Sequence, residues 1–142
     1  AGSKDVREIK VHPDVTFIAT ANVGSEYTGA NSSMDRALLS RFFPLELGNI
    51  PSGDESDVLM YRTKIEKKDS DLIVRVANNI RSLYNKQEIS LSLSIRETLM
   101  VAELVSDGWT LGNAMEMIYL PLFEGTKTDG ERSTIYKTIS SY

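Results

Sequence analysis

The sequence predicts an α/β segment of strand, helix and strand, followed by an all-α helical bundle. Apolar and β-branched residues gather in short runs before residue 51, whereas helical periodicity and helix N-cap patterns fill the rest of the chain. The length of 142 residues, with 41% hydrophobic and 25% charged residues, suits one compact domain or two small subdomains that share a core. We therefore expect a fold whose two parts differ in class.

The first part of the chain carries two predicted strands and one predicted helix. Residues 15–21 (VTFIATA) form a nearly continuous apolar run, which is typical of a strand buried on both faces of a parallel sheet. Ser32, followed three residues later by Asp35, predicts the start of a helix that Pro44 ends. Alternating apolar residues over 43–47 predict a second strand.

The second part of the chain is predicted to contain helices only. Pairs of Ser and Glu three residues apart predict capping boxes, and an apolar stripe from residue 72 to residue 84 repeats with the helical period. The predicted helices and their caps are 52–67 (Ser52 with Glu55), a helix through about 84 (Asp69 or Ser70), 94–108 (Ser94 with Glu97), 110–125 (Thr110) and 129–142.

Composition excludes several classes of protein. The chain has no cysteine, which excludes a disulfide scaffold, a thiolate zinc site and a cysteine nucleophile, and fits a reducing compartment. Its one histidine, His12, cannot form a histidine-rich metal site. A net charge of −4 argues against wholesale binding of nucleic acid, and no apolar run is long enough to span a membrane. We therefore expect a soluble, cytoplasmic protein.

The amino end of the chain suggests a fragment. The sequence opens at Ala1 without an initiator methionine, and Ile9 and Val11 alternate as in the return arm of a hairpin. We expect the chain to begin inside a larger domain; a frayed terminus is the alternative.

Asn22 is the first candidate site residue, because it follows the predicted buried strand directly. Ligands bind at the carboxyl ends of strands in open α/β sheets, and an amide there can orient a water or contact a phosphate. The alternative is an asparagine that adopts a turn. Gly24 and Gly29 nearby do not form a phosphate-binding P-loop, because no lysine lies between Lys10 and Lys64.

Arg36 and Arg41 are the only basic residues between Val11 and Tyr61. Two guanidinium groups at the ends of a short helix could contact a phosphate held by a neighbouring subunit, because arginine binds phosphate with two parallel hydrogen bonds. The alternative is a pair of surface arginines in weak salt bridges.

Arg96 lies in the first turn of its predicted helix, where the helix dipole disfavours a cation. An anion bound at that end of the helix would remove the penalty. The alternative is a solvated arginine paired with Glu97. We find no nucleophile–base pair, carboxylate dyad or metal-spaced cluster, and we interpret the lysines at 64, 67 and 68 as a solvated helix face.

The segments HPDVTFIATAN (12–22) and MDRALLSRF (34–42) follow one another in the first part of the chain. They resemble the sensor 1 strand and the arginine-finger helix of AAA+ ATPases. Asn22 matches the sensor 1 asparagine, Arg41 matches the finger, and Arg36 matches a frequent companion of the finger.

The segment SLSIRETL (92–99) resembles the sensor 2 helix of the AAA+ lid, with Arg96 at the sensor arginine. The three segments in this order are similar to the C-terminal half of an AAA+ ATPase domain, closest to the MoxR-like and cobalt-chelatase-like (dynein-related) branch. The resemblance implies that residues 1–51 are the distal part of a P-loop AAA+ core, with hairpin tail, sensor 1 strand, finger helix and last strand. Residues 52–125 would form the helical lid with sensor 2, and residues 126–142 would form a C-terminal helical extension.

The resemblance also implies an activity for the parent protein. Proteins of this kind hydrolyse ATP with Mg²⁺ in a ring, usually a hexamer, and use the cycle to remodel a client protein or complex. Walker A and Walker B motifs do not occur in the sequence and would lie upstream of Ala1, so we expect this chain alone to be inactive and not to bind ATP tightly. Two alternatives stay open: a non-enzymatic helical interaction module, and a DNA-remodelling ATPase, against which the acidic balance argues.

Overall fold

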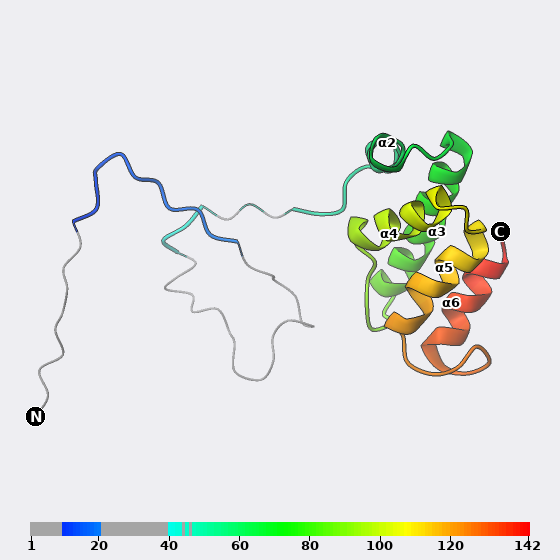
Figure 1. The fold of residues 1–142 in the computed structure, drawn as a ribbon. Coiled ribbons are helices and arrows are strands. Elements are labelled where there is room, and N and C mark those ends of the chain that lie inside the picture. Colours follow the sequence, from blue (N-terminus) through cyan, green and yellow to red (C-terminus); the bar gives the residue numbers. More distant parts are fainter. Residues whose placement is uncertain (1–9, 21–39, 44, 46) are drawn as a thin grey trace, which may run out of the picture. The chain divides into compact units, whose positions relative to one another are not determined.

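Every helix that the structure describes lies between residues 52 and 142 (Figure 1). The structure is a computed structural model that describes residues 10–20, 40–43, 45 and 47–142. The chain divides into two units, Ala1–Phe43 and Pro44–Tyr142. In chain order the described elements are α2 (Ser52–Thr63), α3 (Lys67–Asn85), α4 (Ile95–Ser106), α5 (Leu111–Tyr119), the 3-10 helix η1 (Leu120–Leu122) and α6 (Gly130–Ser140).

The predicted strands are not formed in the described residues. Residues 15–20 have no strand pairing, and Ile18 is 89% exposed instead of buried. Phe43 and Leu47 are likewise exposed and outside any strand. A buried strand needs neighbouring strands to satisfy its backbone groups, and no described segment pairs with these residues. The strand–helix–strand part of the predicted fold is therefore not shown, and the predicted helix after Ser32 lies mostly outside the described residues.

The predicted caps of the first two helices are wrong. Pro51 occupies the N-cap of α2 with no side-chain cap, and Glu55 is buried instead of reaching back to Ser52. The helix ends at Thr63, because Lys64 adopts a left-handed conformation with φ 64°. Side chains on the inner face of a helix take tertiary partners, and this overrides a local capping pattern.

The second helix, α3, begins after Glu66, which makes no side-chain cap. Ser70, one of the two predicted caps, is buried inside α3, and its hydroxyl donates to the backbone oxygen of Ser56 at 2.8 Å. The Ser56 hydroxyl in turn donates to Asp71 at 2.6 Å. This hydrogen bond holds the pKa of Asp71 below its usual value. The two serines therefore join α2 to α3 instead of starting a helix.

The capping box at Ser94 is confirmed, and it starts α4. Thr110 is the N-cap of α5 as predicted, although its side chain makes no capping hydrogen bond. The α5 helix ends at Tyr119 and continues as η1, so the predicted stop at Gly125 is wrong.

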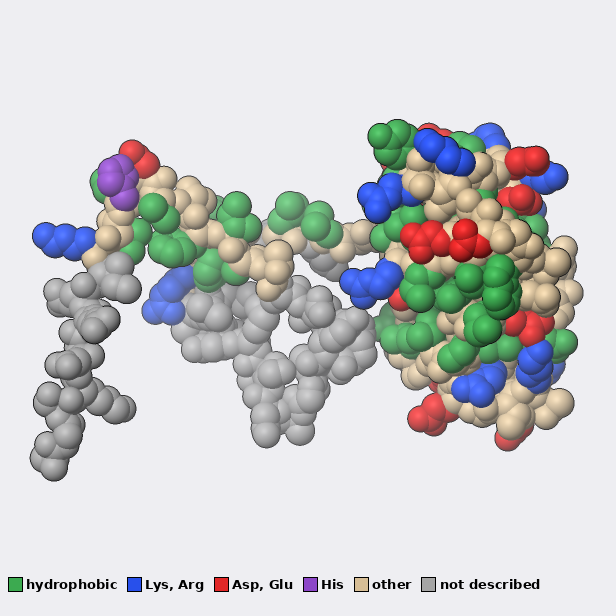
Figure 2. Space-filling model, viewed as in Figure 1, with side chains coloured by type: hydrophobic (Ala, Val, Ile, Leu, Met, Phe, Trp, Pro, Cys, Tyr) green, Lys and Arg blue, Asp and Glu red, His purple; other side chains and the backbone are tan. Residues whose placement is uncertain are grey.

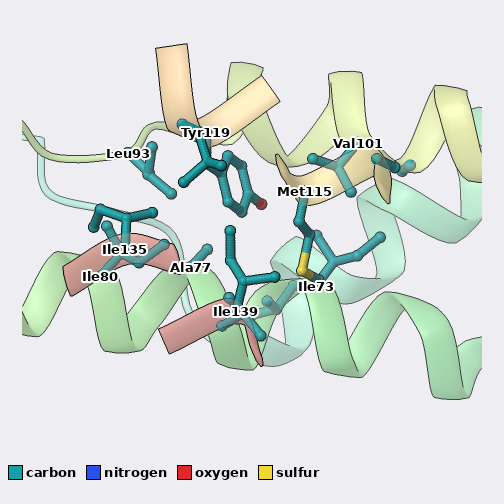
Figure 3. Close-up of a cluster of buried hydrophobic side chains, with 14 of the residues drawn as sticks. Ile73, Ala77, Ile80, Leu93, Val101, Met115, Tyr119, Ile135 and Ile139 are labelled. Carbon is teal, nitrogen blue, oxygen red and sulfur yellow. The ribbon is translucent and has the colours of Figure 1, made fainter. Parts of the chain in front are cut away.

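Helix α3 is the centre of the helical unit, because it contacts each of the other four described α-helices. Its predicted apolar stripe is confirmed: Ile73, Val76 and Ile80 have no exposed surface. Figure 3 shows side chains of α3 facing residues from the other helices and from the segment before α4. The labelled ones are Ile73, Ala77, Ile80, Leu93, Val101, Met115, Tyr119, Ile135 and Ile139. Burial of this apolar surface is the main term that stabilises the bundle.

The C-terminal helix α6 completes the same core. Ile135 and Ile139 are buried, and α6 contacts α3, α5 and η1. The loop before it is fixed by Gly125, whose φ is +102° and where a Cβ atom would lie 2.4 Å from the backbone oxygen of Asp129. Residues 126–142 thus pack with the helices that precede them.

We predict that Tyr119→Phe does not destabilise the chain. The Tyr119 ring is fully buried, and among the described residues its hydroxyl is the one buried side-chain polar atom without a hydrogen-bond partner. Burial raises the pKa of this phenol, so it stays neutral. Because an unpaired buried hydroxyl costs about 1–3 kcal/mol, its removal should leave the free energy of unfolding unchanged or raise it by about 1 kcal/mol.

Urea denaturation of the wild-type protein and of Tyr119→Phe measures this change in the free energy of unfolding. Tyr61→Phe is the control, because Tyr61 is 76% exposed and its substitution should change nothing. A loss of more than about 1 kcal/mol in Tyr119→Phe would show that the hydroxyl has a partner, because that is the net value of a typical hydrogen bond.

Candidate functional site

The start of α4 is the best-defined candidate site in the helical unit. Ser94 is the N-cap, and its Oγ accepts a hydrogen bond from the Arg96 backbone N–H at 3.1 Å. The Glu97 carboxylate accepts from the Ser94 backbone N–H and from the Ser94 hydroxyl, each at 2.7 Å. This reciprocal capping satisfies the backbone donors at the end of the helix and fixes its first turn.

The side chain of Arg96 projects from this first turn into solvent. It forms no ion pair with Glu97 in the described part of the chain, and Glu97 Oε2 accepts both hydrogen bonds from Ser94. The predicted alternative of a paired Arg96 is therefore not formed. An exposed guanidinium at the positive end of a helix dipole is unfavourable alone and favourable beside an anion.

A buried ion pair between Glu55 of α2 and Arg81 of α3 contacts the residues that flank this turn. Arg81 Nη1 donates to Glu55 Oε2 at 2.7 Å, and Arg81 Nη2 donates to Glu55 Oε1 at 2.9 Å. The side chains of Arg81 and Glu55 are only 6% and 1% exposed. Two parallel charge-assisted hydrogen bonds give this pair a fixed geometry.

The ion pair also binds the chain on both sides of Arg96. Arg81 Nε donates to the backbone oxygen of Leu93 at 2.9 Å, and Thr98 Oγ1 donates to Glu55 Oε1 at 2.7 Å. We call these four residues, Glu55, Arg81, Leu93 and Thr98, the ion-pair clamp. Leu93 precedes Arg96 by three residues and Thr98 follows it by two, so the clamp fixes the segment that carries Arg96.

Sequence reasoning missed the clamp. The sequence pattern predicts Glu55 as half of a capping box with Ser52 and assigns no role to Arg81. A signal was present: Arg81 follows Ala77 by four residues, so it lies on the apolar face of α3. A charged residue on such a face needs a buried partner of opposite charge.

The other predicted site residues lie elsewhere in the chain. Asn22 and Arg36 fall outside the described residues. Arg41 lies in an exposed turn over residues 40–42 of the unit Ala1–Phe43, and each unit is described by itself. The structure therefore gives the surroundings of Arg96 and leaves the remaining three assignments as predictions.

The surface of the helical unit carries both signs of charge. Figure 2 shows basic and acidic side chains interspersed around a patch of hydrophobic side chains on one face. Within the described ranges, no group of three or more His, Asp or Glu side chains is arranged to hold a metal ion. None of the described helices is long and apolar enough to cross a membrane.

A family model described as "CbbQ/NirQ/NorQ C-terminal" matches residues 55–131, more than half of the chain. The chain belongs to this family, within the MoxR-like AAA+ proteins. The matched region starts at Glu55 and includes Arg81, Arg96 and Thr98, so the clamp and the start of α4 both lie inside it. The resemblance to the MoxR-like branch is thereby confirmed.

The chain is also similar to a protein of Thauera aromatica named "Putative chaperone BssE". The two are 32% identical over 107 residues, which cover 75% of this chain and 36% of that protein. The chain therefore spans about a third of the length of this relative.

We predict that removal of one partner of the buried ion pair destabilises the fold much more than removal of both. Arg81→Met leaves the Glu55 carboxylate buried without its partner, which should lower the free energy of unfolding by about 3–5 kcal/mol. The double variant Glu55→Leu with Arg81→Met replaces both charges by apolar groups and should recover most of that loss.

Urea denaturation of the single and double variants tests this. Arg75→Met is the matched control, because Arg75 is exposed on the same helix and its loss should change stability by less than about 0.5 kcal/mol. A double variant as unstable as the sum of its single variants would show that the two charges do not depend on each other.

Proposed function

We propose that this chain is the lid-bearing part of an ATP-hydrolysing MoxR-like AAA+ ring ATPase that remodels a partner protein or complex. Membership of the MoxR-like AAA+ proteins supports the proposal, and so does the similarity to a relative whose name includes the word chaperone. The observation that carries it is the exposed guanidinium of Arg96 at the capped start of α4, because that arrangement suits a phosphate.

Arg96 is the proposed contact to the nucleotide phosphates of its own subunit. A guanidinium can donate two parallel hydrogen bonds to a phosphate, and the dipole of α4 adds a favourable field for the anion. Because α4 packs against α2 and α3, a shift of Arg96 toward a bound phosphate would move the whole helical unit. The angle of the lid would in this way follow the state of the nucleotide.

The remaining predicted residues complete the proposed catalytic cycle. Asn22 would position the attacking water or sense the γ-phosphate, and Arg41 would stabilise transition-state charge on the nucleotide of the neighbouring subunit, with Arg36 as its companion. These roles require a ring, for which six subunits is the expected number, and a client protein. We place this protein in the cytoplasm.

ATP and Mg²⁺ are the proposed cofactors of the full-length protein. Among the described residues, Arg96 suits the phosphates of ATP, because it offers an uncompensated positive charge at the start of a helix. The Mg²⁺ ion would be held by Walker motifs, which the 142 residues do not contain. Bound Mg²⁺ would neutralise charge on the phosphates during hydrolysis.

We predict that Arg96→Ala in the full-length protein weakens ATP binding about tenfold and leaves the lid folded. The affinity should fall because one charge-assisted contact to phosphate is lost, and 1.4 kcal/mol corresponds to tenfold. Stability should change by less than about 0.5 kcal/mol, because the side chain is exposed. Equilibrium titration with ATP and thermal unfolding give the two numbers.

Arg62→Ala is the control for this variant, because Arg62 is also an exposed arginine of the helical unit but lies at the end of α2. ATP affinity should not respond to it. If Arg96→Ala binds ATP as well as the Arg62→Ala control does, the helical unit is an interaction module and Arg96 has no role toward nucleotide.

We predict that Arg41→Ala in the full-length protein binds ATP nearly normally and hydrolyses it roughly 10³-fold more slowly, because a finger acts on transition-state charge alone. Mixing this variant with a Walker-A-dead variant should partly restore hydrolysis, since an Arg41→Ala subunit can receive the finger of a dead neighbour. Steady-state ATPase assays of each variant and of the mixture measure both effects. Near-normal hydrolysis by Arg41→Ala would remove the finger assignment.

A further inference from the structure

One buried ion pair hydrogen-bonds to the chain on both the amino side and the carboxyl side of Arg96. On the amino side, the Leu93 backbone oxygen accepts from Arg81 at 2.9 Å. On the carboxyl side, the Thr98 hydroxyl donates to Glu55 at 2.7 Å. The chain between these two anchors holds only four residues, and Arg96 is one of them.

The anchors themselves have little freedom. The Glu55 carboxylate accepts three hydrogen bonds, two from Arg81 and one from Thr98. Arg81 uses its Nε and both terminal nitrogens, and Nη1 also donates to Asn78 Oδ1 at 2.8 Å. Glu55, Arg81 and Thr98 are all buried, so water does not compete for these bonds and their geometry is maintained.

We infer that Glu55, Arg81 and Thr98 are positioning residues that direct the Arg96 guanidinium toward a nucleotide phosphate. The inference rests on the role of Arg96 in the proposed function. None of the three touches the phosphate; they act through the first turn of α4. Fixing this turn in the protein before binding lowers the entropy cost of ordering Arg96 on the ligand.

A substitution at Thr98 can remove one hydrogen bond of the clamp and leave the buried ion pair intact. Its hydroxyl is the side-chain link from α4 to the ion pair, and it also contacts the Ile95 backbone oxygen at 3.0 Å. Thr98→Val keeps the shape of the side chain and removes this link. The bidentate pair of Glu55 and Arg81 remains, so no charge is left without its partner.

The test uses the full-length protein and measures the dissociation constant of a non-hydrolysable ATP analogue with Mg²⁺. Thr98→Val is expected to weaken binding about fivefold or more, the lower range of coupling between sites. Thr98→Ser keeps the hydroxyl and is expected to restore most of the affinity. In the Arg96→Ala background, Thr98→Val is expected to cause no further loss, because the clamp acts through Arg96.

Thr63→Val is the matched control. Thr63 is also a buried threonine, and its hydroxyl donates to the Leu59 backbone oxygen at 2.8 Å at the other end of α2. This variant should lower the melting temperature without changing the affinity for the analogue. Thr98→Val should therefore differ from it in affinity, which a merely structural role would not produce.

Three results would overturn the inference, and they are distinguishable. If Arg96→Ala weakens binding but Thr98→Val behaves like Thr63→Val, the clamp only stabilises the fold and the proposed function stands. If Arg96→Ala leaves binding unchanged, the proposed function fails and the positioning role fails with it. A further loss of affinity from Thr98→Val in the Arg96→Ala background would also exclude action through Arg96.

Discussion

The structure of the helical unit depends on the requirement that the buried charges of Glu55 and Arg81 meet. An isolated charge in a dry interior is very costly, and the cost falls only when the partner is in place with good geometry. Since Glu55 belongs to α2 and Arg81 to α3, this requirement fixes the register of the two helices. The hydrogen bonds to Leu93 and Thr98 extend the constraint to the loop before α4 and to its first turn.

The apolar core and the ion pair have different effects on the fold. Burial of the α3 stripe supplies the stabilising free energy, but apolar contacts are non-directional and tolerate small shifts of one helix along another. The bidentate ion pair tolerates no such shift, because both Arg81 bonds to Glu55 would break together. A buried ion pair adds little net stability, but its bidentate geometry is compatible with only one register of α2 against α3.

Local patterns of the sequence were sufficient where the partners are close in the chain. The capping box of Ser94 and Glu97 closes within four residues, and it was predicted correctly. The same pattern at Ser52 failed, because Glu55 binds a residue 26 positions away that no local rule identifies. The predicted strand over residues 15–21 depends even more on distant partners, since a strand has no hydrogen bonds of its own. The period alone determines the α3 stripe and indicates that Arg81 on that face needs a buried partner, whereas only the tertiary structure identifies Glu55 as that partner.

The first turn of α4 combines two features that would be unfavourable separately. A cation in the first turn opposes the helix dipole, and a surface arginine loses side-chain entropy when it is ordered on a ligand. The capping box offsets the first cost by satisfying the backbone donors with Ser94 and Glu97, so the turn is stable while the Arg96 guanidinium remains uncompensated. The clamp reduces the second cost by holding the backbone of that turn. What remains at the surface is a single positive charge on a fixed support, and an anion is the ligand that such a support favours.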